Sequence, residues 1–441
     1  MSEPLRVAVV GSGPAGFYAA GALLGADVPV EVDMIERLPT PWGLVRLGVA
    51  PDHPKIKSVS RAFEKIAAQP GFRVLGNVEV GRHVSHDELL EHYDAVVYAV
   101  GAQSDRRMGI PGEDLPGSWA ATEFVAWYNG HPDFQGLEFD LSCERVIVIG
   151  NGNVAVDVAR MLALTPEELG PTDTTDAAIE AFNGAHITEI VMVGRRGPAQ
   201  AAFTTPELLE LGELAGADVI VDAADLEGAE PTDTNSERNL DVLREYAARE
   251  PTGKPRRLVL RFFRSPVRIL GESRVEGIEL VRNTLDENAR AVPTGDTETL
   301  ETGLVFRSVG YRGVELPGVP FDESTGTVPN DRGRVSPGVY VAGWIKRGPT
   351  GVIGTNKKDA TETVELLLDD LRDAPRRGTP AEEIDALLLG RGVRLVLYPG
   401  WTSIDVVERA AGERIGRPRV KLCTWDELLD AAEAVATTLD P

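Results

Sequence analysis

Near its start the chain reads Leu5-Arg6-Val7-Ala8-Val9-Val10, followed by Gly11-Ser12-Gly13-Pro14-Ala15-Gly16. The apolar, β-branched run predicts a buried strand, and the apolar residues 17–24 predict a helix after the glycine turn. Gly11 permits the tight turn, Gly13 lets backbone N–H groups approach a pyrophosphate, and Gly16 lets the helix pack closely on the sheet. This order of elements is typical of a dinucleotide-binding fold.

The residue that ends the next strand indicates which dinucleotide fits. A second apolar strand, predicted over residues 28–35, stops at Glu36, twenty residues after Gly16. A carboxylate at this place accepts hydrogen bonds from ribose hydroxyls and repels a 2′-phosphate, so the site favours FAD or NAD over NADP. The alternative is a glycine turn without a ligand, and the agreement of strand, turn, helix, second strand and acid disfavours it.

A second glycine turn follows a strand predicted over residues 144–149. It reads Gly150-Asn151-Gly152-Asn153-Val154-Ala155, and Ala155 in place of the third glycine sets the helix slightly farther from the strand. A strand over residues 188–193 then ends in Gly194-Arg195-Arg196-Gly197. Two guanidinium groups match a 2′-phosphate in charge and geometry, so this site favours NADP. The alternative, a solvated pair of charges at a strand end, is weaker beside a glycine turn.

The remaining pattern predicts an α/β protein of two Rossmann-like, three-layer domains, with the NADP-binding domain inserted into the FAD-binding domain. Apolar strands over 93–102 and 304–311 mark the crossings, and alternating residues 258–283 predict a hairpin in the second domain. The predicted domains are residues 1–104 (FAD, first part), 105–332 (NADP) and 333–441 (FAD, second part, with a C-terminal helical extension).

Composition excludes several classes of protein. A net charge of −24 argues against a nucleic-acid binder. The only two cysteines, Cys143 and Cys423, are far apart, which excludes a redox-active C-x-x-C disulfide, an iron–sulfur cluster and a structural zinc site. No metal site is expected. The chain lacks a signal-peptide pattern and an apolar run of about 18 residues, so we expect a cytoplasmic protein without membrane insertion.

Several blocks resemble one known family. The glycine turns, residues 39–46, residues 48–55, residues 194–197 and residues 343–359 look like adrenodoxin reductase, and closer still like the bacterial NADPH–ferredoxin reductases of actinobacterial type. The resemblance covers nearly the whole chain and is weakest in residues 165–187 and 365–395. It implies a ferredoxin–NADP+ reductase (EC 1.18.1.2 class), an oxidoreductase flavoprotein that transfers a hydride from NADPH to FAD and then single electrons, reversibly, to an iron–sulfur ferredoxin.

The resemblance also implies which residues bind the cofactors. The FAD residues would be Gly11, Gly13, Ala15, Gly16, Glu36, Leu44, Val80, Trp344, Gly351, Val352 and Ile353. The NADP residues would be Arg106, Asn151, Gly152, Asn153, Val154, Arg195, Arg196, Glu207 and Gly351. Arg107 is an alternative to its neighbour Arg106. Trp344 offers a flat ring for the flavin or nicotinamide, or is an ordinary core tryptophan; Gly351 gives the cofactors room, or is a plain turn glycine.

Hydride transfer between two cofactors requires no protein nucleophile. His53 and Glu210 match positions that the family places near the nicotinamide, where they would orient it or exchange a proton; the alternatives are a loop histidine and a solvated helix face. Residues 238–274 carry ten basic and four acidic residues. In the resembling family a basic patch here docks the iron–sulfur partner, through residues such as Arg238 and Arg244, and a solvated helix and hairpin is the alternative.

Other functions remain open at this point. A flavin-dependent monooxygenase or a general diaphorase would also carry two glycine turns, and a NADP-sensing binding module would bind without turnover. The reductase subunits of glutamate-synthase type carry an N-terminal cysteine cluster, which this chain lacks. Disulfide reductases of the FAD family are also excluded, because this chain lacks the pair of redox-active cysteines that they require.

Overall fold

The computed structural model describes residues 3–351 and 353–434, which form two compact units. Unit 1 comprises residues up to Ser104 and from Gly310 onward, and unit 2 comprises Asp105–Val309. The chain therefore returns to its first unit at Gly310, whereas the sequence placed the return at residue 333. The reason is that Val319 and Val328, which lie between the observed and the predicted boundary, pack in a hydrophobic core of unit 1.

Unit 1 is built on a parallel sheet with one antiparallel edge strand, in the order β16-β17-β4-β1-β2-β3. Its strands are β1 (Leu5–Val10), β2 (Val30–Glu36), β3 (Phe72–Gly76), β4 (Ala95–Tyr98), β16 (Arg334–Ser336) and β17 (Val339–Val341). Its helices are α1 (Pro14–Leu24), α2 (Leu44–Leu47), α3 (Pro54–Lys57), α4 (Ser60–Ala67), α5 (His86–His92), α12 (Trp344–Arg347), α13 (Thr355–Asp370), α14 (Ala381–Gly390), α15 (Tyr398–Glu413) and α16 (Trp425–Glu433).

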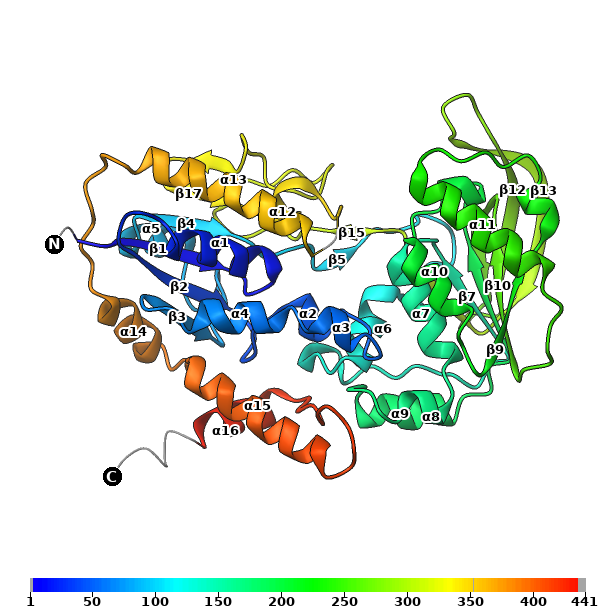
Figure 1. Cartoon of the computed structure of the whole chain (residues 1–441), viewed down its shortest axis with the longest axis horizontal. Helices are drawn as coiled ribbons and strands as arrows, with labels where there is room; N and C mark the ends of the chain where they lie inside the picture. The colour runs from blue at the N-terminus through cyan, green and yellow to red at the C-terminus, as the bar shows by residue number, and fades with distance from the viewer. Residues whose placement is uncertain (1–2, 352, 435–441) are drawn as a thin grey trace. The chain divides into compact units, whose positions relative to one another are not determined.

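Alternation along β1 explains why helices cover both faces of this sheet. Val7 and Val9 point into a core with α1, α4, α13 and α15, while Ala8 and Val10 point into a second core with α5 and α14. Because both faces are buried, the strand has no polar alternation and reads as a continuous apolar run, as parallel strands usually do. Figure 1 shows α1 and α13 side by side over the sheet.

Unit 2 has a second parallel sheet, in the order β6-β14-β7-β8-β10-β9. Its strands are β6 (Ser118–Ala120), β7 (Arg145–Ile149), β8 (Glu189–Val193), β9 (Ala217–Val221), β10 (Arg256–Arg261) and β14 (Leu304–Arg307). Its α-helices are α6 (Ala121–Tyr128), α7 (Asn153–Ala163), α8 (Pro166–Leu169), α9 (Asp176–Asn183), α10 (Thr205–Leu211) and α11 (Thr234–Ala248), with 3-10 turns η1 (Pro132–Phe134), η2 (Pro198–Gln200) and η3 (Ala223–Leu226).

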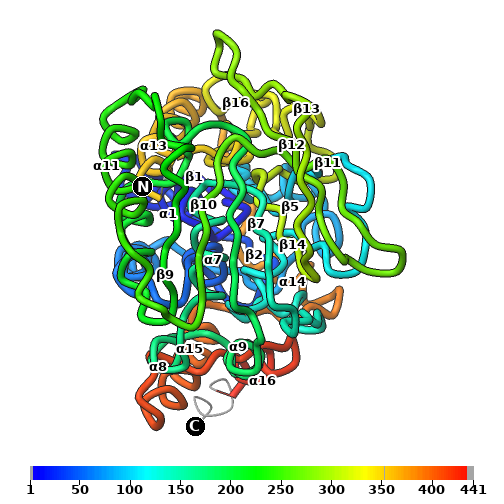
Figure 2. The backbone as a smooth tube through the Cα atoms, turned by 90° about the vertical axis from the view of Figure 1, so that its right-hand side faces the viewer, coloured from blue at the N-terminus to red at the C-terminus, as the bar shows by residue number. Residues whose placement is uncertain are grey.

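The second face of this sheet is covered by strands rather than by helices. Val146 and Val148 of β7 pack among the helices, whereas Ile147 and Ile149 pack against the antiparallel sheet of β11 (Arg264–Leu270), β12 (Gly277–Leu285) and β13 (Ala291–Glu301). Figure 2 shows these three strands together. The predicted hairpin is present as β11 and β12, but β10, which overlaps the start of the predicted range, belongs to the parallel sheet instead.

Three smaller features complete the description. The short strands β5 (Ser104–Asp105) and β15 (Tyr311–Arg312) pair where the chain crosses between the units. Residues 393–397 form only an isolated bridge between Val396 and Gly76, and the predicted C-terminal helical extension ends in a pair of helices, α15 and α16. Among the described residues no helix is both long and apolar enough to cross a membrane.

Candidate functional site

The first glycine turn has the close packing that its sequence predicts. Gly11 has φ +102°, and a Cβ there would lie 2.6 Å from the carbonyl oxygen of Ala99 at the end of β4. A Cβ on Gly16 would lie 1.9 Å from the carbonyl oxygen of Gly11, so α1 rests directly on the turn. A Cβ on Gly13, by contrast, would meet no protein atom within 4 Å, which leaves the space beside its backbone free for a ligand.

Glu36 ends β2 beside this turn and is held in place by the protein itself. Its Oε2 accepts hydrogen bonds from the backbone N–H of Ser12 at 3.0 Å and from the Ser12 hydroxyl at 2.6 Å, and its Oε1 accepts from the N–H of Leu38 at 2.9 Å. A carboxylate has about four acceptor positions, so these three bonds leave capacity for a ribose hydroxyl. The N–H of Val78 bonds to the carbonyl of Glu36, which brings the following loop with Val80 to the same edge of the sheet.

A loop from β2 packs against the turn. The N–H of Trp42 donates to the carbonyl of Ser12 at 3.2 Å, and a Cβ on Gly43 would lie only 2.9 Å from the Cα of Gly13. Leu44 follows as the first residue of α2, with 39% of its surface exposed. The structure thus places an exposed apolar side chain next to the glycine turn, where a flat ligand would cover it.

The segment after β17 also lies against the start of α1. A Cβ on Gly343 would lie 2.5 Å from the Cβ of Ala15. Asp359 of α13 fixes this segment: it accepts from the N–H of Gly343, and one oxygen of its carboxylate lies 3.1 Å from Lys346 and the other 3.1 Å from Arg347. Sequence reasoning did not assign a role to Asp359 or to Ser12, although both lie inside the motif blocks.

Trp344, at the start of α12, is half-buried and its ring lies 5.4 Å from that of Tyr311. Its Nε1 is buried and has no hydrogen-bond partner among the described residues. A buried indole N–H usually finds an acceptor, so this atom fits a site whose acceptor comes from a ligand. Gly351 is exposed with φ +81°, Ile353 packs at the rim of the α1 core, and Val352 lies outside the described residues.

The second glycine turn is linked to the arginine segment through Asn151. The N–H of Gly150 donates to the carbonyl of Val193, and the absence of a side chain on Gly194 leaves room for the Asn151 amide, whose Nδ2 would be 2.6 Å from a Cβ there. The Oδ1 of Asn153 accepts from the N–H of Thr204 at 2.8 Å. Gly152 and Val154 are half-buried at the start of α7, and a Cβ on Gly152 would reach only the methyl of Ala202, at 4.0 Å.

Arg195 and Arg196 are held by their backbone and not by acids. The Asn283 amide donates to the carbonyl of Arg195 at 2.8 Å, and the N–H of Phe263 donates to the carbonyl of Arg196 at 3.0 Å. Arg195 is exposed and Arg196 half-buried, and among the described residues no carboxylate lies within ion-pair distance of either guanidinium. Two such cations at the end of a strand fit a phosphate dianion.

Arg106 and Arg107 differ in whether a carboxylate pairs with them. Arg107 pairs with Asp114 at 2.5 Å and lies 3.6 Å from Glu113, and these acids raise the pKa of its guanidinium. Arg106 is exposed and has no such pair within the described part of the chain. Of these two arginines, Arg106 is therefore the one with its charge uncompensated.

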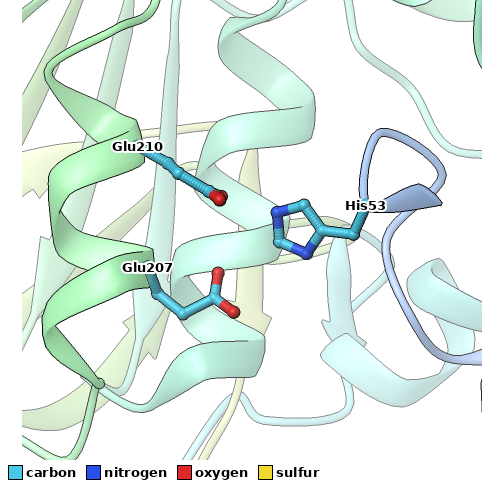
Figure 3. Close-up of side chains that lie close together, drawn as sticks. All are labelled: His53, Glu207 and Glu210. Atoms are coloured by element: carbon cyan, nitrogen blue, oxygen red, sulfur yellow. The ribbon is translucent and has the colours of Figure 1, made fainter. Parts of the chain in front are cut away.

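The remaining predicted site residues lie on short elements. Glu207 and Glu210 extend from the same side of α10 in unit 2, one turn apart, and Glu210 lies 3.7 Å from Arg160, which also pairs with Asp157. His53 precedes α3 in unit 1 (Figure 3). Its backbone N–H donates to the carbonyl of Ala50 at 3.0 Å.

Most of the basic residues in the stretch 238–274 are paired with acids or with backbone carbonyls in the folded chain. Seven of its arginines pair with carboxylates: Arg244, Arg249, Arg257, Arg261, Arg264, Arg268 and Arg274. Lys254 and Arg256 donate to backbone carbonyls. Arg238 is exposed on α11 and has no ion-pair partner among the described residues, so an unbroken cationic surface is not formed.

The chain is similar to known proteins over nearly its whole length. Residues 5–170 match the family model described as pyridine nucleotide-disulphide oxidoreductase. NADPH-ferredoxin reductase FprA of Mycobacterium tuberculosis is 55% identical over 97% of this chain and 99% of its own length. The mitochondrial NADPH:adrenodoxin oxidoreductase of Homo sapiens is 45% identical over 96% of this chain and 91% of its own length.

A solved structure, that of Mycobacterium tuberculosis FprA in complex with NADPH, superposes with a TM-score of 0.94 at 53% sequence identity, and covers 98% of this chain and 100% of its own. Identity at this level over nearly the full length leaves no room for a different fold. By these similarities the chain belongs to the family of NADPH–ferredoxin and adrenodoxin reductases, flavoprotein oxidoreductases of the α/β class.

Proposed function

We propose that this chain is an FAD-containing NADPH:ferredoxin oxidoreductase, with FAD in unit 1 and NADP in unit 2. The observation that carries the assignment is the opposite charge at two equivalent strand ends. β2 ends in Glu36, while β8 is followed by Arg195 and Arg196. An acid excludes a 2′-phosphate and two uncompensated guanidiniums attract it, so each unit selects its own cofactor.

In unit 1 the protein supplies a rigid cradle. The N-terminus of α1 and the open backbone at Gly13 face the pyrophosphate, and Glu36 binds the ribose. Ala15 and Gly16 shape the turn, Leu44 and Val80 line the flavin, and the segment with Trp344, Gly351, Val352 and Ile353 completes the site. Trp344 donates its Nε1 proton to a ligand acceptor.

In unit 2 the residues Asn151, Gly152, Asn153 and Val154 form the pyrophosphate turn at the start of α7. Arg195 and Arg196 bind the 2′-phosphate, with Arg106 and Glu207 contributing further polar contacts. FAD supplies, when bound, the ability to accept a hydride and to release electrons one at a time. His53 and Glu210 orient the nicotinamide or exchange a proton, and neither acts as a nucleophile.

The protein partner is an iron–sulfur ferredoxin, and we place the site of its docking near Arg238 and Arg244 on α11. Because the net charge is −24, an acidic partner would be repelled at long range. Of the two arginines, Arg244 pairs with Asp241, so the local positive charge would come mainly from Arg238, which has no ion-pair partner among the described residues. Rising salt should then lower the rate of ferredoxin reduction, and a rate independent of salt would count against this docking site. We further propose that the enzyme works in the cytoplasm, where NADPH is available.

The cofactor assignment is tested by anaerobic stopped-flow mixing of the FAD-loaded protein with NADPH or NADH. NADPH should bleach the flavin band far faster. The double variant Arg195→Ala with Arg196→Ala should lower the efficiency of reduction by NADPH about 100-fold, since it removes two charge-assisted contacts, and should change reduction by NADH little. The matched control is Arg282→Ala with Arg290→Ala, two exposed arginines of the same unit, which should keep the preference.

The alternatives give different outcomes. Equal rates with NADPH and NADH in the parent protein would contradict the role of the arginine pair. A monooxygenase would consume oxygen in step with hydroxylation of an added substrate, a general diaphorase would reduce dyes but not a ferredoxin, and a NADP-sensing module would bind NADPH without reducing anything. The proposed activity requires NADPH-dependent reduction of cytochrome c that depends on added ferredoxin.

A further inference from the structure

A buried carboxylate lies in α15, far along the chain from the glycine turns. Glu408 has a fully buried side chain, and both of its oxygens bind Arg46, with Arg46 Nη1 at 2.8 Å and Nη2 at 2.5 Å. The two residues are 362 positions apart in the sequence. Arg419 adds a further bond to Glu408 at 2.9 Å, and the N–H of Leu422 donates to it at 2.9 Å. These hydrogen bonds fill the acceptor positions of the carboxylate.

The arginines around Glu408 favour its charged form. Burial by itself would raise the pKa of Glu408, but Arg46 and Arg419 outweigh burial and hold that pKa below its usual value. Arg46 has only 4% of its side chain exposed and lies 5.3 Å above the ring of Trp401. A bidentate pair of this kind has one geometry, so it fixes the position of both partners.

Arg46 belongs to the loop that packs against the first glycine turn. The N–H of Arg46 bonds to the carbonyl of Gly43, and the N–H of Val45 bonds to the carbonyl of Trp42, both at 3.1 Å. Trp42 in turn bonds to Ser12, and Gly43 touches Gly13. The rings of Trp401 and Trp42 form a T-shaped pair, with ring centres 6.1 Å apart. An unbroken series of contacts therefore runs from Glu408 to the turn that would hold the pyrophosphate.

We propose that Glu408 is a positioning residue of the flavin site: through Arg46 it holds residues 42–44 against Gly13, so that α15 is part of the apparatus that retains FAD. The inference rests on the proposed assignment of FAD to unit 1. It predicts that a break in this pair weakens FAD binding beyond any general loss of stability. A purely structural pair would lower stability alone.

The same unit contains a matched pair for comparison. Arg6 is as deeply buried, with 8% of its side chain exposed, and its Nη2 lies 2.8 Å from Asp33. Asp33 also binds Arg73 and Tyr93, so it keeps a cation when Arg6 is removed, as Glu408 keeps Arg419. Arg6 instead ties β1 to the carbonyl of Thr379, and its contacts do not include the loop of residues 42–44.

The experiment compares Arg46→Met with Arg6→Met in the full-length protein. Each apoprotein is unfolded thermally, and each is then titrated with FAD while flavin fluorescence and visible circular dichroism are recorded. Both variants should unfold at lower temperature than the parent. Only Arg46→Met should raise the dissociation constant of FAD, by about ten-fold, and alter the flavin dichroism, while Arg6→Met stays within about two-fold of the parent.

Equal weakening of FAD binding in the two variants, or none in either, would overturn the inference. If a methionine variant does not fold, Arg46→Lys and Arg6→Lys make the same comparison, because lysine keeps the charge but loses the bidentate geometry. Arg46→Lys should then weaken FAD binding and Arg6→Lys should not. Failure of the parent protein to bind FAD would instead contradict the proposed function.

Discussion

The two glycine turns share one architecture but differ at the two places that decide packing and charge. Gly11 and Gly150 each touch the carbonyl end of the neighbouring strand, at Ala99 and Ser308 respectively, with no room for a Cβ. At the third position, however, Gly16 is replaced by Ala155, whose methyl is fully buried. The second turn therefore accommodates a side chain that the first excludes.

The charges differ in their environment as well as in sign. Glu36 is held by three hydrogen bonds from residues around the turn, whereas Arg195 and Arg196 have no acidic partner among the described residues. A fixed acceptor suits a cofactor that stays bound, and free cations suit one that arrives and leaves with its own negative charge. In the proposed assignment, cofactor selectivity depends on the strand ends, while both turns would bind a pyrophosphate.

The largest effect is expected from Gly16→Ala. A Cβ at 1.9 Å from the Gly11 carbonyl oxygen forces α1 away from the turn, so the apoprotein should lose about 3 kcal/mol of stability and should not retain FAD. Denaturant unfolding and the visible spectrum of the purified protein measure the two effects. The control is Gly13→Ala, which should unfold like the parent because its Cβ meets no protein atom, yet should bind FAD more weakly.

Normal flavin content in Gly16→Ala would show that the first turn tolerates a side chain as the second does. The two turns would then not differ in packing at the third position, and only the charges at the strand ends would distinguish the two folds.

Local sequence was sufficient for the elements that carry the two turns. β1 spans the predicted residues, and β2, β7 and β8 fall within one or two residues of prediction, because apolar runs bounded by glycine have few alternatives. The strand β13 was not predicted, since its residues are mostly exposed, include a proline and a glycine, and lack an apolar alternation. Its place is set by pairing with β12, which local sequence does not reveal.

Candidate site residues on the turns carry a signal in the sequence, whereas the residues that support them in the structure do not. Glu36 and the arginine pair are marked by a fixed distance from glycines, but Asp359 and Glu408 have no such signal. Glu408 looks like an ordinary helix acid, one of three in α15, and only the fold brings it to Arg46 across 362 positions. The return of the chain at Gly310 was missed because the apolar residues of 316–328 are too sparse to form a regular element.

A moderate effect is expected from Glu36→Gln. The amide keeps one acceptor, but its NH2 group meets donors of Ser12 or Leu38, so the FAD affinity should fall about ten-fold. Titration of the apoprotein with FAD measures this. Glu31→Gln is the control on the same strand: its carboxylate is 46% exposed and 3.7 Å from Arg6, and FAD binding should stay unchanged. Equal affinities in the two variants would mean that Glu36 is not the ribose acceptor.

The smallest effect is expected from Ala155→Gly, which makes the second turn match the first. The change removes a buried methyl and a good helix former from the first turn of α7, so the free energy of unfolding should fall by about 1 kcal/mol. Ala159→Gly, deeper in the same helix and equally buried, should lower it by a similar amount. Because the phosphate would be bound by backbone groups at Gly152 and by the arginines, the KM for NADPH should be the same in both variants. A ten-fold rise in KM for Ala155→Gly alone would show that the methyl sets the shape of the turn, and that packing as well as charge distinguishes the two cofactor sites.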